Sequence, residues 1–506
     1  MSATTTPDTL EGWEIVIGLE VHAELATKTK LFSGALNHFG SEPNTNIDPV
    51  SLGLPGSLPV LNEKAVELAI RVGLALHCDI RPSVFARKNY FYPDMPKDFQ
   101  ISQYDQPIDL GGWLELPSGK RVGITRAHLE EDTGKNTHMG GTGRIGGAEY
   151  SLIDYNRSGV PLLEIVSEPD LRSAEEARDY VEELRSILVA IGASDGKMEE
   201  GSLRVDCNVS VHRPDEPFGT RCEIKNVNSL RSLGRAVHYE ARRQVDLIEA
   251  GERIRQETRH WDENNGRTTP GRSKENSEDY RYFPEPDLVP VVPDAAWIED
   301  IRAALPMLPA QRRQRLAEAA GVAAGELAVV VAVSRGMDEL ALAAIEGLGA
   351  AAPTGERARV LTHIEHNLPV EGAEGLPAAS LAALVRLEGA GKLTATQAKL
   401  VLADMLAEVV ADAAANTGAV GVPDPAAIAA ARGFEAMDAG SLDGLLDDVI
   451  AQNPEQWARF VAGDAKERGR LNGFFVGAVM KATNNKADGK AVTAGLRARA
   501  EALPAG

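Results

Sequence analysis

The sequence of 506 residues is poor in cysteine and in long hydrophobic runs. It has three cysteines, Cys78, Cys207 and Cys222, and none belongs to a CxxC pair or to a zinc-type Cys/His spacing. So sparse a set argues against a disulfide framework and a structural zinc site. Cys207 and Cys222 fall on the apolar side of strand-like segments, which favours small core residues over catalytic thiols. Because no apolar run reaches membrane-spanning length and the first residues lack the basic and apolar parts of a signal peptide, we expect a cytoplasmic protein.

Basic residues are also scarce, because the 53 Lys and Arg residues are outnumbered by 74 Asp and Glu residues, which gives a net charge of −21. A protein this acidic repels nucleic acid on average, so any RNA contact must come from a local basic patch. The sequence lacks a Walker A lysine loop, a protein-kinase signature and a plausible Ser or Cys amidase nucleophile. Any ATP chemistry must therefore use another scaffold, and any ammonia must come from another protein.

One glycine motif is misleading. Residues 141–146 read GxGxxG, but a strand pattern follows them where a dinucleotide site would need a helix. We interpret this segment as a glycine-rich hairpin loop, and residues 150–156 and 161–168 as the two strands of a second hairpin.

The character of the sequence changes near residue 293. Before it, the sequence is rich in alternating strand patterns, tight turns and prolines, and it holds most of the aromatic residues; after it, Ala/Leu/Glu/Arg stretches have helical spacing. The length is that of about three domains. We expect an α+β fold, with an antiparallel-sheet domain at 1–293, a helical domain at 294–410 and a small all-α tail at 411–506.

Several strand patterns have one apolar side and one side that bears imidazole, carboxylate, amide or lysine groups. In the first, Trp13, Ile15, Ile17, Leu19 and Val21 alternate with Gly18, Glu20, His22 and Glu24. The segments around residues 164, 206 and 224 repeat the pattern. If these strands share one antiparallel sheet whose apolar side packs on helices, the other side is a broad polar platform and the candidate site. The alternative for each strand alone is an edge strand with a solvated acidic side.

The platform would carry carboxylates and one imidazole. Glu164 has apolar neighbours in sequence, and because an unpaired buried carboxylate is costly, we expect it to be paired or bound to a metal. The acidic run 130–132 directly follows a strand pattern, which suits either a solvated turn or an oxygen-donor metal site. Such a donor set favours magnesium over zinc, and magnesium with nearby lysines suits phosphoryl transfer.

Two further segments combine cations with aromatic rings. Residues 88–97 crowd three aromatics and two lysines into a proline-rich loop that suits a nucleotide base, a phosphate or an RNA end, unless its rings simply pack on the surface. Residues 272–287 suit a phosphate clamp or a closing linker equally well. In the tail, basic residues outnumber acids between 466 and 499, which indicates either a local RNA-binding surface or a solvated helical face.

These motifs together resemble the B-subunit family of tRNA-dependent amidotransferases, the GatB family of the GatCAB complexes. The resemblance covers the whole first domain and is weaker in the tail. It is carried by Val16–His22, Arg87–Asp94, His128–Asp132, Leu163–Asp170, Lys197–Arg204, Glu223–Asn228 and Asp279–Asp287, and in the tail by Asn453, Pro454 and Val476–Lys481.

The resemblance implies a cradle-shaped domain for the acceptor end of a misacylated tRNA, a helical domain and a YqeY-like tail that contacts tRNA. It implies that ATP phosphorylates the side-chain carboxylate of Glu-tRNA(Gln) or Asp-tRNA(Asn), and that ammonia displaces the phosphate. The implied partners are a GatA-like glutaminase subunit and a GatC-like small subunit, and the implied cofactors are ATP and Mg²⁺. Which of the two tRNAs is used stays open.

The resemblance also assigns residues. It implies a magnesium site of Glu20, His22, Glu131 and Glu164, with Asp206 as a further polar member. Glu130 is the alternative to Glu131, because strand alternation puts these two side chains on opposite faces. Lys88 and Tyr90 resemble residues near the tRNA terminus and phosphate, and Lys225 and Arg281 are candidates for the nucleotide phosphates.

Two other interpretations compete with this one. An RNA-binding subunit without chemistry would explain the tail and the aromatic loop but not the carboxylates. A related archaeal-type subunit would be expected to carry an additional β-rich insertion before the tail, and no such segment is recognisable.

Overall fold

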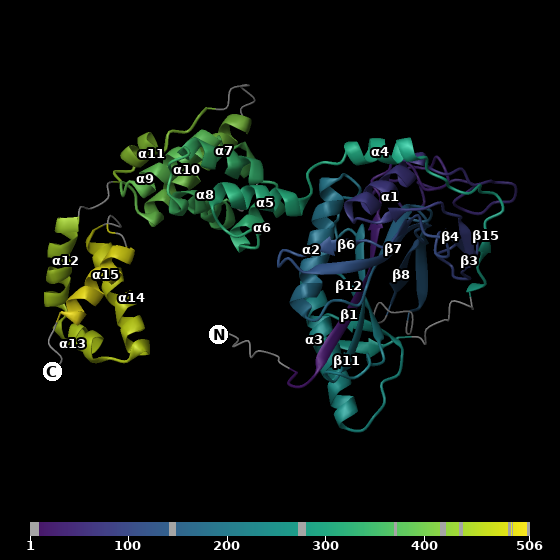
Figure 1. Ribbon diagram of the computed structural model, residues 1–506, viewed down its shortest axis with the longest axis horizontal. Helices are drawn as coiled ribbons and strands as arrows, with labels where there is room; N and C mark the ends of the chain where they lie inside the picture. Colours follow the sequence, from purple (N-terminus) through teal and green to yellow (C-terminus); the bar gives the residue numbers. More distant parts are fainter. Residues whose placement is uncertain are drawn as a thin grey trace. The chain divides into compact units, whose positions relative to one another are not determined.

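The computed structural model describes residues 10–140, 148–271, 280–368, 372–414, 421–434, 439–483, 487 and 489–502. The chain divides into two compact units, Met1–Ala310 and Gln311–Gly506. The first unit is built around a large sheet and the second is helical (Figure 1). This arrangement confirms the predicted α+β class with strands first and helices after.

The large sheet contains most of the strands of the first unit. Its main path runs β14-β13-β12-β11-β1-β10-β7-β4-β3-β15, with β5 and β6 also paired to β7 and β2 paired to β5. All described pairings are antiparallel except that of β12 with β13. The strands are β1 (Glu14–Glu24), β2 (Asp79–Ile80), β3 (Ala86–Asn89), β4 (Phe99–Ser102), β5 (Asp109–Leu110), β6 (Trp113–Glu115), β7 (Arg121–Glu131), β10 (Pro161–Ser167), β11 (Leu203–His212), β12 (Cys222–Val227), β13 (Thr258–Asp262), β14 (Arg267–Pro270) and β15 (Phe283–Pro284).

The alternating strands predicted from the sequence lie side by side in this sheet. β1 is central, with β10 on one side and β11 on the other, and β12 pairs with β11. Along β1, Ile17, Leu19 and Val21 are buried in the core, whereas Glu20 and His22 are partly exposed. One face of the sheet therefore packs and the other carries polar groups, as the alternation predicts.

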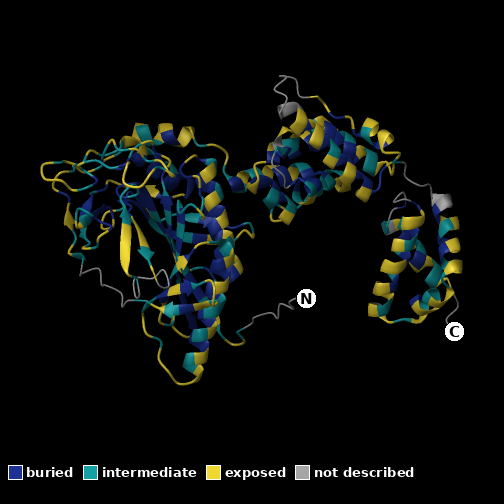
Figure 2. Ribbon diagram, turned by 180° about the vertical axis from the view of Figure 1, so that it is seen from behind, coloured by how far each residue is buried: buried dark blue, intermediate teal, exposed yellow. Residues whose placement is uncertain are grey.

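Helices cover the apolar face. α1 (Glu63–Ala75), α2 (Ala174–Ala190) and α3 (Leu230–Glu249) contribute to the same hydrophobic core as the inward side chains of β1 (Figures 1 and 2). Asn62 and Ser173 cap the first two helices by accepting hydrogen bonds from the backbone N–H groups of Lys64 and Glu176.

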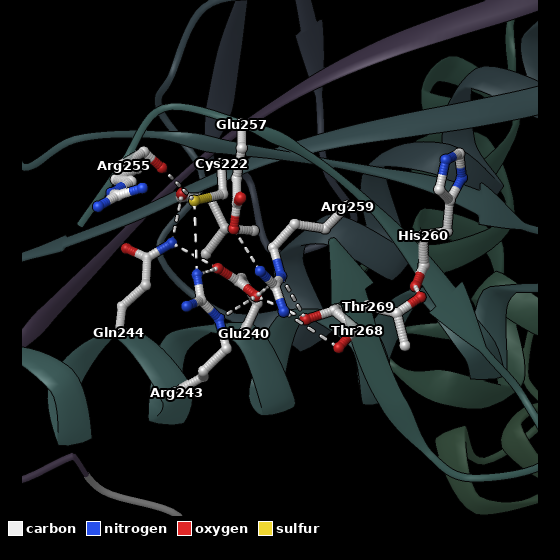
Figure 3. Close-up of polar contacts among 11 residues, drawn as sticks. Cys222, Glu240, Arg243, Gln244, Arg255, Glu257, Arg259, His260, Thr268 and Thr269 are labelled. Atoms are coloured by element: carbon white, nitrogen blue, oxygen red, sulfur yellow. Dashed lines mark hydrogen bonds and ion pairs between the residues drawn. The ribbon is translucent and has the colours of Figure 1, made fainter. Parts of the chain in front are cut away.

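A buried polar network fixes α3 to the edge of the sheet (Figure 3). The carboxylate of Glu240 accepts hydrogen bonds from Arg243 (2.6 and 2.9 Å), Gln244 (2.9 Å) and Thr268 of β14 (2.9 Å). Arg259 of β13 donates to the Thr268 hydroxyl at 2.8 Å and lies 3.4 Å from Glu240. Because every one of these contacts involves a charged group, the network ties helix to sheet more strongly than neutral hydrogen bonds would.

One expected hairpin is wrong. β9 (Tyr150–Asp154) pairs with β8 (Lys135–Met139) in a separate two-stranded sheet, whereas β10 joins the large sheet between β1 and β7. The chain turns between β9 and β10 at residues 155–159, but the alternating pattern of each strand does not say which partner it takes. The glycine motif at 141–146 lies outside the described residues.

The first domain boundary lies later than the sequence suggests. α4 (Ala295–Ala303) follows the expected boundary at 293, yet it contacts α1, and its Ile301 is buried in the core of the first unit. Composition changes at 293 because strands end there, but the apolar face of α4 still completes the first core. The structural division falls at 310.

The second unit holds two separate hydrophobic cores. The first is built from α5 (Pro309–Ala320), α6 (Leu327–Ser334), α7 (Asp338–Leu348), α8 (Thr354–Asn367), α9 (Ala378–Gly389), α10 (Ala395–Ala414), α11 (Pro425–Ala431) and the 3-10 turn Ala373–Gly375. The second is built from α12 (Ala439–Gln452), α13 (Pro454–Ala462), α14 (Ala465–Ala482) and α15 (Gly489–Glu501). The expected boundary at 410 falls inside α10, and Ala429 of α11 still belongs to the first core. Alanine enrichment hid this boundary, because it blurs the ends of helices in the sequence.

Among the helices of the described residues, none combines the length and apolar character needed to cross a membrane.

Candidate functional site

Three adjacent strands bring an imidazole, a carboxylate and a second imidazole into one row. In the register of the sheet, His22 of β1 lies opposite Glu164 of β10, and Glu164 lies opposite His128 of β7. Directly opposed residues point to the same face of a sheet. The Nε2 atom of His22 is 3.3 Å from Glu164 Oε2, and that of His128 is 3.8 Å from the same oxygen.

His22, Glu164 and Glu130 form a group that can hold a metal ion, the metal-type group. One potential ligand atom from each lies within 4.8 Å of those from the other two. Two carboxylates and an imidazole are a hard, mainly oxygen donor set, which fits magnesium. The predicted pair His22 and Glu164 is therefore brought together, and the third member of the group is Glu130.

The electrostatics of the row favour a charged carboxylate. Burial alone would raise the pKa of Glu164, but the positive charges of His128, His22 and Arg126 hold that pKa well below its usual range. Burial opposes protonation of His22, yet its hydrogen bond to Glu164 and the surrounding acids raise its pKa to about 9. A cation is thus held next to Glu164 even without a metal, and a metal ion bound there would replace the proton on His22.

Glu131 does not join this group, contrary to the prediction. It follows Glu130 on β7, so its side chain points to the other face, where Lys97 Nζ lies 2.6 and 2.5 Å from its two carboxylate oxygens. The backbone N–H of Ile101 also donates to Glu131 at 3.1 Å. The parity of the strand already separates these two side chains, because Glu131 shares its parity with the apolar Leu129, and Glu130 shares its parity with His128.

Glu20 and Asp206 form a second acidic group beside the first. They lie opposite each other on β1 and β11, and the carboxylate of Glu20 accepts a hydrogen bond from Asn208 at 2.9 Å. Burial and the charges of Glu164 and Glu223 raise the pKa of Glu20. Lys225 of β12 donates to Asp206 at 2.5 Å. Glu20 therefore lies beside the metal-type group but is not one of its three members. Lys225 supplies positive charge at this end of the polar face.

Lys88 lies in β3, Tyr90 directly follows that strand, and Arg281 lies just before β15. The ammonium group of Lys88 is 4.7 Å from the centre of the Tyr280 ring, and the ring of Tyr90 stacks on that of Tyr92 at 4.7 Å. Asn89 joins the two segments by donating to the backbone carbonyls of Tyr280 and Arg281. The structure thus brings the two aromatic segments of the sequence together, as a surface on which Arg281 is exposed.

Sequence reasoning missed the aromatic and cationic wall beside the metal-type group. Tyr104 stacks on Tyr282 at 5.2 Å, presents a ring 4.8 Å from the guanidinium of Arg126 and meets His128 edge-on at 6.3 Å. Arg126 in turn lies 3.7 Å from Glu164. The alternation of residues along β7 could have placed Arg126 and His128 on the polar face. The positions of Tyr104 and Tyr282 beside them depend on loops, whose sequences have no alternating pattern.

A cavity of about 810 Å³ opens where β1 ends. Its lining includes Glu24, Arg157 and Arg204. Asp132 accepts a hydrogen bond from Arg204 at 2.6 Å and lies 3.4 Å from Arg157 Nε, and these charges lower its pKa. Burial and the charge of Asp132 raise the pKa of Glu24 to about 8, against the two arginines. The cavity is of a size typical of small-ligand sites.

Comparison with known proteins covers both units. The model of the GatB/GatE catalytic domain matches residues 15–299, and that of the GatB domain matches residues 359–499. The chain is 48% identical to the B subunit of the aspartyl/glutamyl-tRNA(Asn/Gln) amidotransferase of Frankia casuarinae, over 96% of this chain and 95% of that protein. It is 48% identical to the protein of the same name from Salinispora arenicola (97% of each chain) and 45% identical to that from Nostoc punctiforme (97% of this chain, 98% of the other). The chain therefore belongs to the family of aspartyl/glutamyl-tRNA amidotransferase B subunits.

Proposed function

We propose that this chain is the subunit of a tRNA-dependent amidotransferase in which the misacylated amino acid is activated and amidated. ATP phosphorylates the side-chain carboxylate of Glu-tRNA(Gln), Asp-tRNA(Asn) or both, and ammonia then displaces the phosphate to give Gln-tRNA(Gln) or Asn-tRNA(Asn). The observation that carries the proposal is the group of His22, Glu130 and Glu164 on adjacent strands of the polar face. The family to which the chain belongs supplies the class of reaction.

The need for ATP follows from elementary chemistry. A carboxylate offers ammonia no viable leaving group, whereas an acyl phosphate does. The enzyme is thus a ligase that forms a carbon–nitrogen bond, and its protein part must position phosphates and neutralise charge more than it must react covalently.

His22, Glu130 and Glu164 would hold Mg²⁺, which supplies positive charge to the phosphates of ATP when it is bound. Arg126 and His128 keep Glu164 ionised and ready for this role. Lys225, at the β12 end of the platform, and Lys88 and Arg281, at the β3 end, are the cations proposed for the phosphate groups of the nucleotide and of the tRNA end. Tyr90 and its stacked neighbour Tyr92 offer a surface for the terminal base.

The ammonia is proposed to come from a GatA-like glutaminase subunit, with a GatC-like small subunit completing a heterotrimer. Support comes from the thiols of this chain, because Cys78, Cys207 and Cys222 are all buried and burial raises the pKa of each. Such thiols are poor nucleophiles for glutamine hydrolysis. Cytoplasmic location agrees with the free state of all three cysteines.

The test measures ADP and amidated tRNA formed by the assembled complex with Glu-tRNA(Gln) and with Asp-tRNA(Asn). Glu164→Gln keeps the size of the side chain but removes one negative charge from the metal-type group, so we expect loss of tRNA-dependent ADP formation and weaker Mn²⁺ binding. Glu168→Gln is the matched control, because Glu168 is exposed just beyond the same strand and contacts Thr125. Unchanged turnover in Glu164→Gln would favour the alternative of an RNA-binding subunit without chemistry.

A further inference from the structure

Arg126 adjoins the metal-type group and keeps its hydrogen-bond donors unused. It lies on β7, two residues before His128 and on the same face of the strand. Its guanidinium group is 3.7 Å from the carboxylate of Glu164, which is too long for a hydrogen bond. The guanidinium donates no hydrogen bond to any residue that the structure describes, and its Nε atom is enclosed without a partner. Arg126 thus contributes charge here but not yet a directed contact.

Two aromatic rings hold this guanidinium in place. Its central carbon lies over the ring of Tyr104, 4.8 Å from the ring centre, and Tyr104 is itself stacked on Tyr282 at 5.2 Å. A cation over an aromatic ring is held by the electrons of the ring and needs no hydrogen-bond acceptor. The fork of Arg126 is therefore fixed in position, and its N–H groups are left to donate to an oxyanion.

The transferred phosphoryl group is the oxyanion that best suits this fork. An anion that binds at the metal-type group comes within reach of Arg126, because the guanidinium is beside Glu164. In the transfer, the bond between the γ-phosphorus and the oxygen it shares with the β-phosphate breaks, and that oxygen leaves with the electron pair as part of ADP. A carboxylate oxygen of the amino acid forms the new bond to phosphorus. Negative charge is then spread over three phosphoryl oxygens, to which a guanidinium can donate two hydrogen bonds at once.

We infer that the guanidinium of Arg126 binds the phosphoryl group as it passes from ATP to the side-chain carboxylate of the misacylated amino acid. This inference rests on the proposed function and adds a catalytic residue on β7 to it. Lys225 lies at the β12 end of the polar face, and Lys88 and Arg281 lie at the β3 end. Arg126, in contrast, is next to the metal-type group itself.

The experiment measures tRNA-dependent ADP formation by the assembled complex for the unmodified chain, Arg126→Gln, Arg126→Lys and Arg121→Gln. Arg121 is the matched control, because it lies on the same strand with its guanidinium 3.9 Å from the centre of the Trp113 ring, but its charge partner is Glu115. We expect Arg126→Gln to lower kcat about 100-fold or more, as loss of a donor to the transition state does. Arg126→Lys keeps the charge without the fork and should recover only part of kcat. Arg121→Gln should match the unmodified complex.

Binding measurements distinguish a phosphoryl contact from mere support of Glu164. Mn²⁺ titration and thermal unfolding of Arg126→Gln should match those of the unmodified complex, because His22 and His128 still lie beside Glu164. ADP with aluminium fluoride mimics the transferred phosphoryl group in the presence of Glu-tRNA(Gln). We expect Arg126→Gln to bind this mimic about 10-fold more weakly, as loss of a charge-assisted hydrogen bond would, and to bind ADP alone equally well.

The outcomes separate this inference from the proposed function. An unchanged kcat in Arg126→Gln, full recovery in Arg126→Lys, or a loss of Mn²⁺ affinity that matches the loss of kcat would overturn the contact and leave Arg126 as a charge that supports Glu164. A higher KM for Glu-tRNA(Gln) with unchanged kcat would assign the fork to the substrate carboxylate and would also overturn it. If the unmodified complex forms no ADP with either misacylated tRNA, the proposed function itself fails.

Discussion

Lys97 and Glu131 form a buried ion pair, with Nζ 2.6 and 2.5 Å from the two carboxylate oxygens, on the face of β7 opposite Glu130. Both side chains are almost fully enclosed. Two neighbouring glutamates on one strand therefore have different surroundings: Glu131 neutralises a buried cation, and Glu130 lies with His22 and Glu164 in the metal-type group. This division can be tested directly, because the two residues are chemically identical.

Glu131→Gln should destabilise the fold, because it leaves the Lys97 ammonium buried without a counter-charge. Loss of one partner of a buried pair costs about 3–5 kcal/mol. Glu130→Gln should change stability less but weaken Mn²⁺ binding. Denaturant unfolding and Mn²⁺ titration of both variants check this, and Lys97→Met combined with Glu131→Leu should recover part of the lost stability. A Glu131→Gln variant with normal stability and weak Mn²⁺ binding would reverse the assignment.

The sequence predicted the platform because alternation along β1, β10 and β11 is a local property that survives folding. Glu130 was only the alternative to Glu131, because the acidic run was assigned by resemblance; Leu129 shares its parity with Glu131, which places the Glu130 side chain on the polar face. The partner of β10 and the approach of Tyr104 to His128 could not be predicted, since strand pairing and loop placement depend on contacts distant in sequence. Glu24 was placed on the correct face of β1, but the cavity beside it needs loops from several segments.

Asp109 should make stability fall as the pH rises. Its side chain is fully buried in β5, its two carboxylate oxygens have no hydrogen-bond partner among the described residues, and burial raises its pKa well above the ordinary value of 3.8. The folded state then holds a proton that the unfolded chain releases, so the stability contribution present below pH 3.8 is lost as pH rises toward the folded pKa. Asp109→Asn removes this dependence at nearly constant size.

Thermal or denaturant unfolding of Asp109→Asn across the acid to neutral range gives the check. The free energy of unfolding of the variant, relative to the unmodified chain, should rise by about 1.4 kcal/mol per pH unit between pH 3.8 and the folded pKa of Asp109. Near pH 4 the two proteins should differ little. Asp105→Asn is the control, because Asp105 is exposed nearby in sequence. A constant difference between Asp109→Asn and the unmodified chain at all pH values would show that folding does not change the pKa of Asp109, and would contradict the prediction.

Glu240 should have the opposite pH dependence. Burial alone would raise its pKa, but hydrogen bonds from Arg243, Gln244 and Thr268 lower it below the ordinary value of 4.5. A depressed folded pKa gives stability that is present above pH 4.5 and is lost as the pH falls through the folded pKa. Glu240→Gln leaves the arginines of this network without their shared carboxylate, so we expect a loss of about 3–5 kcal/mol at neutral pH.

The measurement is denaturant unfolding of Glu240→Gln at neutral and acid pH, with exposed Asp246→Asn on the same helix as control. The difference from the unmodified chain should be largest at neutral pH and shrink at acid pH, where Glu240 itself becomes protonated. Equal stability of Glu240→Gln and the unmodified chain at pH 7 would contradict the role of this network in holding α3 to the sheet.

Phe475 should decide the stability of the C-terminal helical core. It is fully buried on α14, with its ring 5.8 Å from that of Trp457 and 6.0 Å from that of Phe460, both edge-on. Phe475→Ala removes a large buried ring, which typically costs about 3–5 kcal/mol. The adjacent Phe474 is 44% exposed, so Phe474→Ala is a matched control with a smaller expected effect.

Hydrogen exchange of the full chain provides the readout, because it reports each core separately. In Phe475→Ala, amides of α12 to α15 should exchange faster, while those of α5 to α11 keep their protection, since the two sets of helices have separate hydrophobic cores. Phe474→Ala should leave both sets close to the unmodified pattern. Faster exchange throughout α5 to α15 in Phe475→Ala would instead show that the second unit unfolds as one cooperative body, and the two cores would then have to be treated as a single domain.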